Sequence, residues 1–267
     1  MGDAKRRKSS VNECVYCGAR ENLSDEHIIP LGLGGKLTLR KASCKACAVA
    51  TGKLEQSLLR GHWWSARQYH GIVSGRHKET VPDLKVKLHD ADGSFRTATI
   101  PLREQTLTLI FEFPTPTIIN GKTSYDEPYA SSVDAKALGP TPKSVTIDGK
   151  RHLVSSTEKI EFPVNFDAGK LARFLAKVAH SYAISRRGLG ACHEYFLPEF
   201  ILGRTVGLLT YVGGKSSSIV GPFLPGGGMH RMMDRKQGEF LSVYIQLFID
   251  GGDAPPIYEV IVGRLQK

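Results

Sequence analysis

Apolar residues recur at helical spacing over one long segment in the second half of the chain. From Asp167 to Ser185 the apolar positions follow a spacing of three and four residues; they are Leu171, Phe174, Leu175, Val178, Ala179 and Tyr182. Asp167 is suited to cap the first turn, because its carboxylate can accept hydrogen bonds from free backbone N–H groups. The pattern predicts an amphipathic helix whose other face carries Lys170, Arg173 and Lys177, with His180 near its end.

Short runs of β-branched and aromatic residues predict strands on both sides of that helix. Two β-hairpins are predicted around Asp-Gly turns, one at Asp92-Gly93 and one at Asp148-Gly149. Further strands are predicted at 106–113, 240–249 and 258–262. Residues 114–143 are rich in Pro, Ser, Gly and Lys, and they predict a long loop. We therefore expect an α+β domain with antiparallel strands over residues 81–267.

Cysteine pairs mark the other end of the chain. Cys14 and Cys17 form one CxxC pair, and Cys44 and Cys47 form a second. Two such pairs at this separation are typical of a zinc site made of four thiolates. The sequence starts MGDAKRRK without an apolar signal segment, so we expect a cytoplasmic protein with reduced thiols. The fifth cysteine, Cys192, is expected to be a buried or free thiol.

A short acidic and histidine-containing run lies between the two pairs. It reads Asp25-Glu26-His27-Ile28-Ile29-Pro30 and is followed by Gly34-Gly35. After the second pair, residues 48–59 have helix-compatible apolar spacing and end before Gly61. A zinc site of four cysteines has no structural need for the adjacent carboxylate and imidazole, so Glu26 and His27 are candidates for chemistry.

The order CVYCG, SDEHIIPLGLGG and SCKAC resembles the HNH endonucleases, over about residues 12 to 62. The resemblance implies a small zinc-bound ββα-metal module with Cys14, Cys17, Cys44 and Cys47 as ligands of a structural zinc. It implies that His27 is the general base. It also implies that Glu26 holds a catalytic Mg²⁺ or Mn²⁺ ion. Asp25 is a further candidate, either for the same ion or for orienting His27.

Elementary chemistry agrees with these roles. A histidine titrates near neutral pH and can take a proton from water, and a hard cation on carboxylate oxygens can take up charge developing on a phosphate. Adjacent residues of a strand point to opposite faces, so Glu26 and His27 converge on one phosphate only if the backbone bends there. Pro30 and the glycines after it are consistent with such a turn.

The chain departs from the family pattern after the last cysteine. Ala48 stands where the family has a metal-ligating side chain, usually Asn or His. Three explanations compete. Glu55 could replace that ligand, although it lies about 10 Å further along the helix axis. The ion could instead be held by Glu26, phosphate and water, or the chain could be inactive.

Positive charge is concentrated at the same end of the chain. Residues 1–80 contain 14 Lys and Arg and 7 Asp and Glu, a net charge of +7 out of +10 for the whole chain. This distribution favours a polyanionic partner, for which we expect double-stranded DNA. Four side chains could contact phosphates; they are Arg40, Lys41, Lys45 and Lys53. Residues 1–11 predict a flexible basic arm.

Trp63 and Trp64 open a predicted connector, residues 63–80. They could stack on bases, or they could pack one domain on the other, which we favour. No apolar run approaches the roughly 18–20 residues that cross a membrane.

We expect a metal-dependent DNA endonuclease of the HNH type, which would act as a homodimer for double-strand breaks and could serve in defence against foreign DNA, including phage. Two alternatives remain. One is a nucleic-acid-binding module that does not cleave. The other is a nuclease switched by a sensing C-terminal domain.

Overall fold

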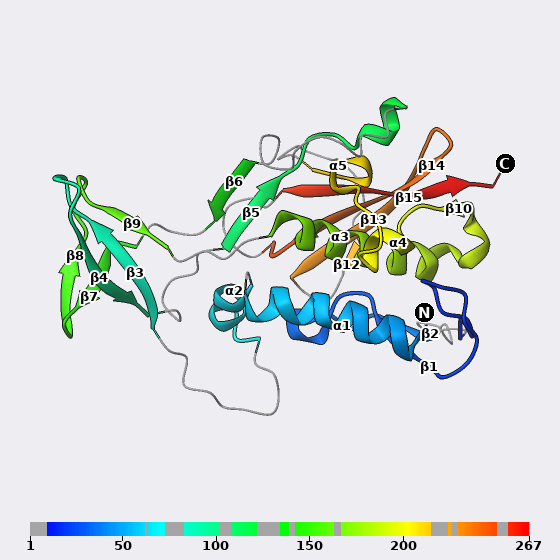
Figure 1. Ribbon diagram of the computed structural model, residues 1–267, viewed down its shortest axis with the longest axis horizontal. Coiled ribbons are helices and arrows are strands. Elements are labelled where there is room, and N and C mark those ends of the chain that lie inside the picture. Colours follow the sequence, from blue (N-terminus) through cyan, green and yellow to red (C-terminus); the bar gives the residue numbers. More distant parts are fainter. Residues whose placement is uncertain are drawn as a thin grey trace, which may run out of the picture.

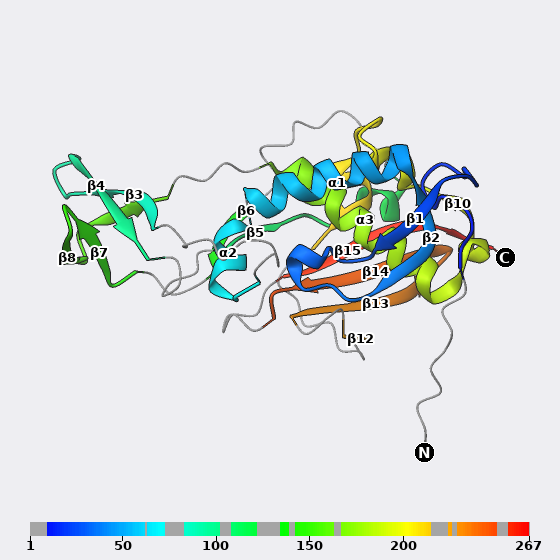
Figure 2. The same ribbon diagram turned by 90° about the horizontal axis from the view of Figure 1, so that it is seen from below.

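The computed structural model describes residues 10–61, 63–72, 83–101, 108–121, 134–138, 142–162, 167–214, 224–225, 229–249 and 256–266. Three parts are visible in Figures 1 and 2: an N-terminal ββα module, a helix-covered antiparallel sheet beside it, and a small separate sheet at one end of the molecule. The fold is α+β, as predicted.

The ββα module is built from two antiparallel strands and one helix. Its elements are β1 (Leu23–His27), the short 3-10 turn η1 (Leu31–Leu33), β2 (Thr38–Cys44) and α1 (Lys45–Arg60). The helix begins three residues before the predicted start, because Cys44 has extended backbone geometry and serves as its N-cap. It ends before Gly61, as predicted. A short helix, α2 (Trp64–Tyr69), follows.

The larger sheet and its helix fill the centre of the molecule. Its strands pair antiparallel in the order β10 (Cys192–Tyr195), β15 (Ile257–Leu265), β14 (Phe240–Leu247), β13 (His230–Gln237) and β12 (Leu224–Pro225), with β11 (Val212–Gly213) also on β15. Helix α3 (Ala168–Arg187) crosses one face of the sheet, and Asp167 caps it by accepting the Lys170 N–H at 3.0 Å. Three short helices, η3 (Leu189–Ala191), α4 (Pro198–Ile201) and α5 (Leu208–Tyr211), surround α3.

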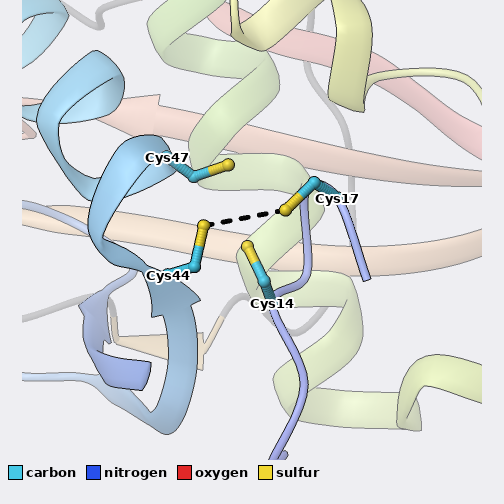
Figure 3. Close-up of side chains that lie close together, drawn as sticks. All are labelled: Cys14, Cys17, Cys44 and Cys47. Carbon is cyan, nitrogen blue, oxygen red and sulfur yellow. Dashed lines mark hydrogen bonds between the residues drawn. The ribbon is translucent and has the colours of Figure 1, made fainter. Parts of the chain in front are cut away.

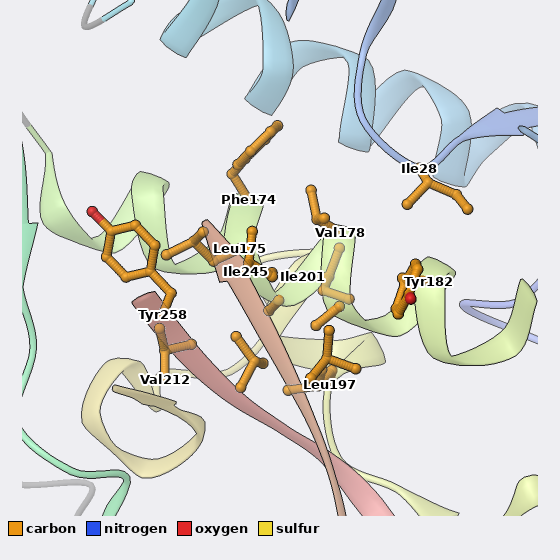
Figure 4. Packing of buried hydrophobic residues seen from close by; sticks show 14 of the residues in the cluster. Ile28, Phe174, Leu175, Val178, Tyr182, Leu197, Ile201, Val212, Ile245 and Tyr258 are labelled. Atoms are coloured by element: carbon orange, nitrogen blue, oxygen red, sulfur yellow. The ribbon is translucent and has the colours of Figure 1, made fainter. Parts of the chain in front are cut away.

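Helix α3 lies between the sheet and α1, so it is covered on two sides (Figures 1 and 2). One apolar core contains residues of the module, of α3 and of the sheet. Figure 4 shows Ile28, just after β1, facing the side chains that α3 directs toward the module. Trp63 is buried and lies 4.6 Å from the ring of Phe174. The packing interpretation of Trp63 is therefore confirmed.

The separate sheet has its own small core. Its strand order is β8 (Lys150–Leu153), β7 (Ser144–Ile147), β4 (Phe95–Ile100), β3 (Leu84–His89) and β9 (Lys159–Glu161). Both predicted hairpins are present, because Gly93 and Gly149 adopt the positive φ angles that the turns require. The core of this sheet is formed by Val86, Leu88, Ala98, Ile100 and Val145.

Two predictions from the sequence are corrected. The segment 114–143 is not one long loop, because it contains η2 (Thr117–Asn120) and β6 (Asp134–Leu138), and β6 pairs with β5 (Thr108–Glu112). Residues 122–133 of that segment lie outside the described residues. Lys177 is not on a solvent-facing side of its helix but is completely buried, because α1 and the hairpin cover that face.

Among the described residues, no helix combines the length and apolar character that a membrane crossing requires.

Candidate active site and zinc centre

The four predicted zinc ligands lie together. The sulfur atoms of Cys14, Cys17, Cys44 and Cys47 are all within 4.8 Å of one another, and Figure 3 shows them converging from the N-terminal loop and the start of α1. The Sγ atoms of Cys17 and Cys44 are 3.7 Å apart. A tetrahedral ion with Zn–S bonds of about 2.3 Å places its sulfurs about 3.8 Å apart. The donor set and its spacing therefore fit zinc.

Backbone hydrogen bonds hold the first cysteine pair against the hairpin. The Val15 N–H donates to the Ala42 carbonyl at 2.9 Å, and the Gly18 N–H donates to the Cys14 carbonyl at 2.8 Å. Gly18 has φ 74°, which a residue with a side chain rarely adopts. The backbone N–H of Cys47 donates to the Cys44 sulfur and lowers the pKa of that thiol to about 7. Cys44 is thereby prepared to bind metal as a thiolate.

The hairpin that carries Asp25, Glu26 and His27 has one irregularity in its strand pairing, and it lies before Glu26. Its pairing register shifts between Ser24 and Glu26, and Lys41 on the facing strand adopts φ 46°. Asp25 stabilises this bulge, because its carboxylate accepts the Lys41 backbone N–H at 3.0 Å. The Asp25 carboxylate is thus used to hold the hairpin backbone.

Glu26 and His27 lie in the regular part of the ladder, opposite Leu39 and Thr38. The backbone bends before these residues rather than between them, so their side chains point to opposite faces. Glu26 is buried toward α3, and His27 is half-buried on the other face. Within the described residues, the imidazole of His27 forms no hydrogen bond or ion pair. The two side chains are therefore not brought together.

Glu26 is instead brought together with Glu55, the candidate from the helix. Both carboxylates contact the ammonium of Lys177, with Nζ at 2.8 Å from Glu26 Oε1 and 2.7 Å from Glu55 Oε1. The Lys177 side chain is 0% exposed, against 7% for Glu26 and 19% for Glu55. The ammonium also donates to the backbone carbonyls of His27 and Ile28.

These charges stabilise one another in an environment that little water reaches. Burial by itself lowers the pKa of Lys177, but the two carboxylates outweigh that effect and the pKa is raised. Tyr16 lies nearby with its hydroxyl 3.3 Å from the Ser181 hydroxyl, and burial raises its pKa, with the Glu26 charge adding to the effect. Lys177 therefore stays protonated between two carboxylates.

Two histidines from the C-terminal part of the chain also contact the module, and no sequence motif indicates either role. His180 Nε2 lies 2.7 Å from the Val15 carbonyl, inside the first CxxC pair. His230 Nε2 lies 2.7 Å from the Leu33 carbonyl, after β1. Both partners are backbone atoms, which no sequence motif identifies. Together with Lys177, these residues satisfy module carbonyls that would otherwise be buried without donors.

The four predicted phosphate contacts are exposed. Arg40 and Lys41 extend from β2, and Lys45 and Lys53 extend from α1. In the described part of the chain none of the four forms an ion pair, although Arg20 of the same module is paired with Glu13. Their charge is therefore available to an anionic partner.

Ala48 faces an open surface hollow at the start of α1. The hollow is also lined by Asn22, Ser24, Lys45 and Val49. Ala48 offers no ligand atom, and Glu55 follows two helical turns later on the same side of α1. Glu55 reaches the position of Glu26 without displacement of the helix, because both side chains extend to Lys177.

Comparison with protein families finds one match in this region. The HNH endonuclease family model matches residues 14–62. The resemblance seen in the sequence is confirmed over this segment, which includes the four cysteines, the hairpin and α1. The comparisons with curated proteins and with solved structures gave no match.

Proposed function

We propose that this chain, whose residues 14–62 form an HNH endonuclease module, is a nuclease that hydrolyses phosphodiester bonds in DNA. The observation that carries the proposal is the family match together with the half-buried imidazole of His27, which has no hydrogen-bond or ion-pair partner among the described residues. His27 would take a proton from water, whose oxygen then bonds to phosphorus; one P–O ester bond breaks, and the departing sugar oxygen takes up a proton from solvent. An imidazole suits this role because it titrates near neutral pH.

Four exposed cations support a nucleic-acid substrate. Arg40, Lys41, Lys45 and Lys53 would contact backbone phosphates, whose neutralisation supplies affinity that depends on salt but not on sequence. The concentration of charge in residues 1–80 favours the same partner. Because one site cuts one strand, a double-strand break requires two copies of the chain on the DNA.

The side chains suit the expected structural zinc but not the expected catalytic divalent ion. Zinc on the four cysteines would fix the geometry of the hairpin and the start of α1. A catalytic Mg²⁺ or Mn²⁺ ion on Glu26, with Asp25 or Glu55 as further ligands, does not fit these side chains as they lie. Glu26 and Glu55 are engaged by Lys177, and Asp25 is engaged by the backbone of Lys41. A divalent ion on these three carboxylates is therefore not part of the proposed mechanism.

A second candidate function is nucleic-acid binding without cleavage. Two observations favour it: Ala48 supplies no ligand atom, and Lys177 occupies the carboxylates that would hold an ion. In this case the module would bind DNA through its exposed cations, and affinity would fall steeply as salt is raised.

Plasmid nicking tests the proposed function. The full chain, the His27→Ala variant and a His193→Ala control are incubated with supercoiled plasmid in Mg²⁺, in Mn²⁺ and in a weak chelator that removes both but spares zinc. His193 is an exposed histidine of β10, distant from the module in sequence, whose Nδ1 lies 3.0 Å from the Leu265 carbonyl. We expect the nicking rate of His27→Ala to be about 10²–10⁴-fold lower than that of the wild type, as for the loss of other general bases. The control should nick at the wild-type rate.

Zinc content, measured on the same samples, should be one ion per chain in all three proteins. Nicking by His27→Ala at the wild-type rate would remove His27 from the mechanism. Salt-dependent DNA binding by the wild type without any nicking would favour the second candidate function.

A further inference from the structure

The ammonium of Lys177 lies where two acidic side chains from different elements of the module meet. Glu26 comes from β1 and Glu55 comes from α1, and each places one carboxylate oxygen within 2.8 Å of Nζ. The lysine itself comes from α3, 151 positions after Glu26 in the chain. One buried cation thus joins three elements.

All hydrogen-bond donors of this ammonium are used inside the protein. An ammonium has three N–H donors, and here Glu26, Glu55 and the His27 carbonyl accept them, with the Ile28 carbonyl at 3.3 Å. The side chain is fully buried. Lys177 therefore has neither a free donor nor a solvent-exposed surface with which to bind a phosphate.

Two carboxylates that face one point with little water require a cation between them, because their mutual repulsion is weakly screened there. A divalent ion such as Mg²⁺ requires about six oxygen ligands at roughly 2.1 Å, several of them water. An ammonium in contact with both carboxylates leaves no such coordination shell. An ion that entered would also leave Lys177 buried without its partners.

We propose that Lys177 is the resident cation of the Glu26–Glu55 pair and stands in place of a divalent ion. The folded chain then binds no Mg²⁺ or Mn²⁺ at these carboxylates, and α3 supplies from outside the HNH module the cation that separates them. The inference concerns the site of the proposed function, but its test measures metal binding and stability, so it can fail or hold independently of cleavage.

The test compares Mn²⁺ binding by zinc-loaded full-length proteins, followed by the loss of the free Mn²⁺ signal in electron paramagnetic resonance. The proteins are the wild type, Lys177→Met, the triple variant Lys177→Met/Glu26→Gln/Glu55→Gln, and Lys170→Met as a control. Lys170 is on the same helix but is half-exposed, with its nearest acid being the exposed Asp167. We expect the wild type and the control to bind no Mn²⁺ at this site at millimolar concentration.

Lys177→Met should gain one Mn²⁺ per chain with an affinity at least 100-fold above the wild type, and the triple variant should lose it again. Removal of the lysine leaves the buried Glu26 beside the half-buried Glu55 with no cation between them, so Lys177→Met should also have a lower melting temperature. Added Mn²⁺, or the two further substitutions of the triple variant, should raise that temperature.

Three results would overturn the inference. The first is a Mn²⁺ site in the wild type that the single substitution Glu26→Gln abolishes. The second is a folded Lys177→Met protein that binds no Mn²⁺. The third is a triple variant as unstable as Lys177→Met, which would mean that Lys177 does not act through charge balance. If Lys177→Met does not fold even with Mn²⁺, the wild-type titration and the stability of the triple variant decide.

Discussion

His180 lies one helical turn after Lys177 and connects α3 to the zinc-binding loop. Its Nε2 donates to the Val15 carbonyl, and its Nδ1 has no partner among the described residues. Burial lowers the pKa of His180 to about 4, from an ordinary value of 6.5. The imidazole is therefore neutral in the folded protein at pH values at which an unfolded chain would already be protonated.

We predict that His180 makes the stability of the protein depend on pH. The unfolded chain binds the extra proton as pH falls below 6.5, whereas the folded chain resists it until about pH 4. Stability is thus intact above pH 6.5 and is lost between these two values, by about 2 kcal/mol from pH 7 to pH 5. Urea unfolding at each pH measures the effect.

The comparison for this prediction is His180→Gln, whose amide can still donate to Val15 but does not titrate. Between pH 7 and pH 5, the free energy of unfolding of the variant should fall by about 2 kcal/mol less than that of the wild type. Equal losses in the two proteins would assign the pH dependence to other groups, such as the thiols.

Individual site residues were predictable from the sequence only where a local motif contains them. The four cysteines, Glu26 and His27 all lie in such motifs, and the cysteines do converge as expected. Helical periodicity places Lys177 on a polar helix face, because periodicity cannot tell a solvent-facing side from one covered by another part of the chain. His180 and His230 contact backbone carbonyls far away in sequence, and periodicity carries no information about such partners.

At the scale of helices and turns, two glycines of the module differ in whether a side chain would fit in their place. Gly35 follows the 3-10 turn between β1 and β2, and a Cβ atom added there would lie 2.0 Å from the Ile29 carbonyl oxygen. Gly52 is inside α1, and a Cβ atom added there would meet nothing within 4 Å. The first glycine is required by a close backbone approach, and the second only weakens its helix.

We predict that Gly35→Ala destabilises the protein and that Gly52→Ala stabilises it. The clash at Gly35 involves backbone, so the hairpin must shift, at a cost of more than about 2 kcal/mol. Alanine at 52 should add about 0.5–1 kcal/mol, because it favours the helical conformation. Both free energies come from urea unfolding of zinc-loaded protein. A neutral Gly35→Ala would show that the turn is free to move.

Elements with a local signal were predictable, and those without one were not. Helix α3 begins at its predicted cap, and both Asp-Gly hairpins form, since cap and turn chemistry act within a few residues. Strand β13 was missed because it is half exposed along its length and its sequence, HRMMDRKQ, is mostly polar. It is a strand because it pairs with β14 over eight residues, which is a tertiary effect.

At the scale of the whole molecule, the module and the C-terminal domain share one apolar core. Trp63 inserts between Phe174 and Phe248, and the buried Lys177 forms ion pairs with Glu26 and Glu55 of the module. Composition separates these two regions in the sequence, but composition does not report whether their surfaces pack together. The sequence predicted the order of the parts and not the extent of their contact.

We predict that a fragment of residues 10–72 binds zinc but does not fold cooperatively. It would lack Lys177, His180 and His230 and would expose Trp63, so its remaining core is too small. Far-ultraviolet circular dichroism during heating, with zinc bound, should show a broad transition, whereas the full chain should show a sharp one. A sharp transition of the fragment at the temperature of the full chain would contradict this.

The contact among Glu26, Glu55 and Lys177 also constrains how the sequence can diverge. A mutation that neutralises Lys177 leaves two adjacent carboxylates without a cation, and one that reverses either carboxylate places a second cation beside the buried ammonium; each change typically costs several kcal/mol. Homologues that keep the fold should therefore either replace all three residues together, or bind a metal ion at the two carboxylates where the lysine is lost. In an alignment of homologues, positions 26, 55 and 177 should therefore covary.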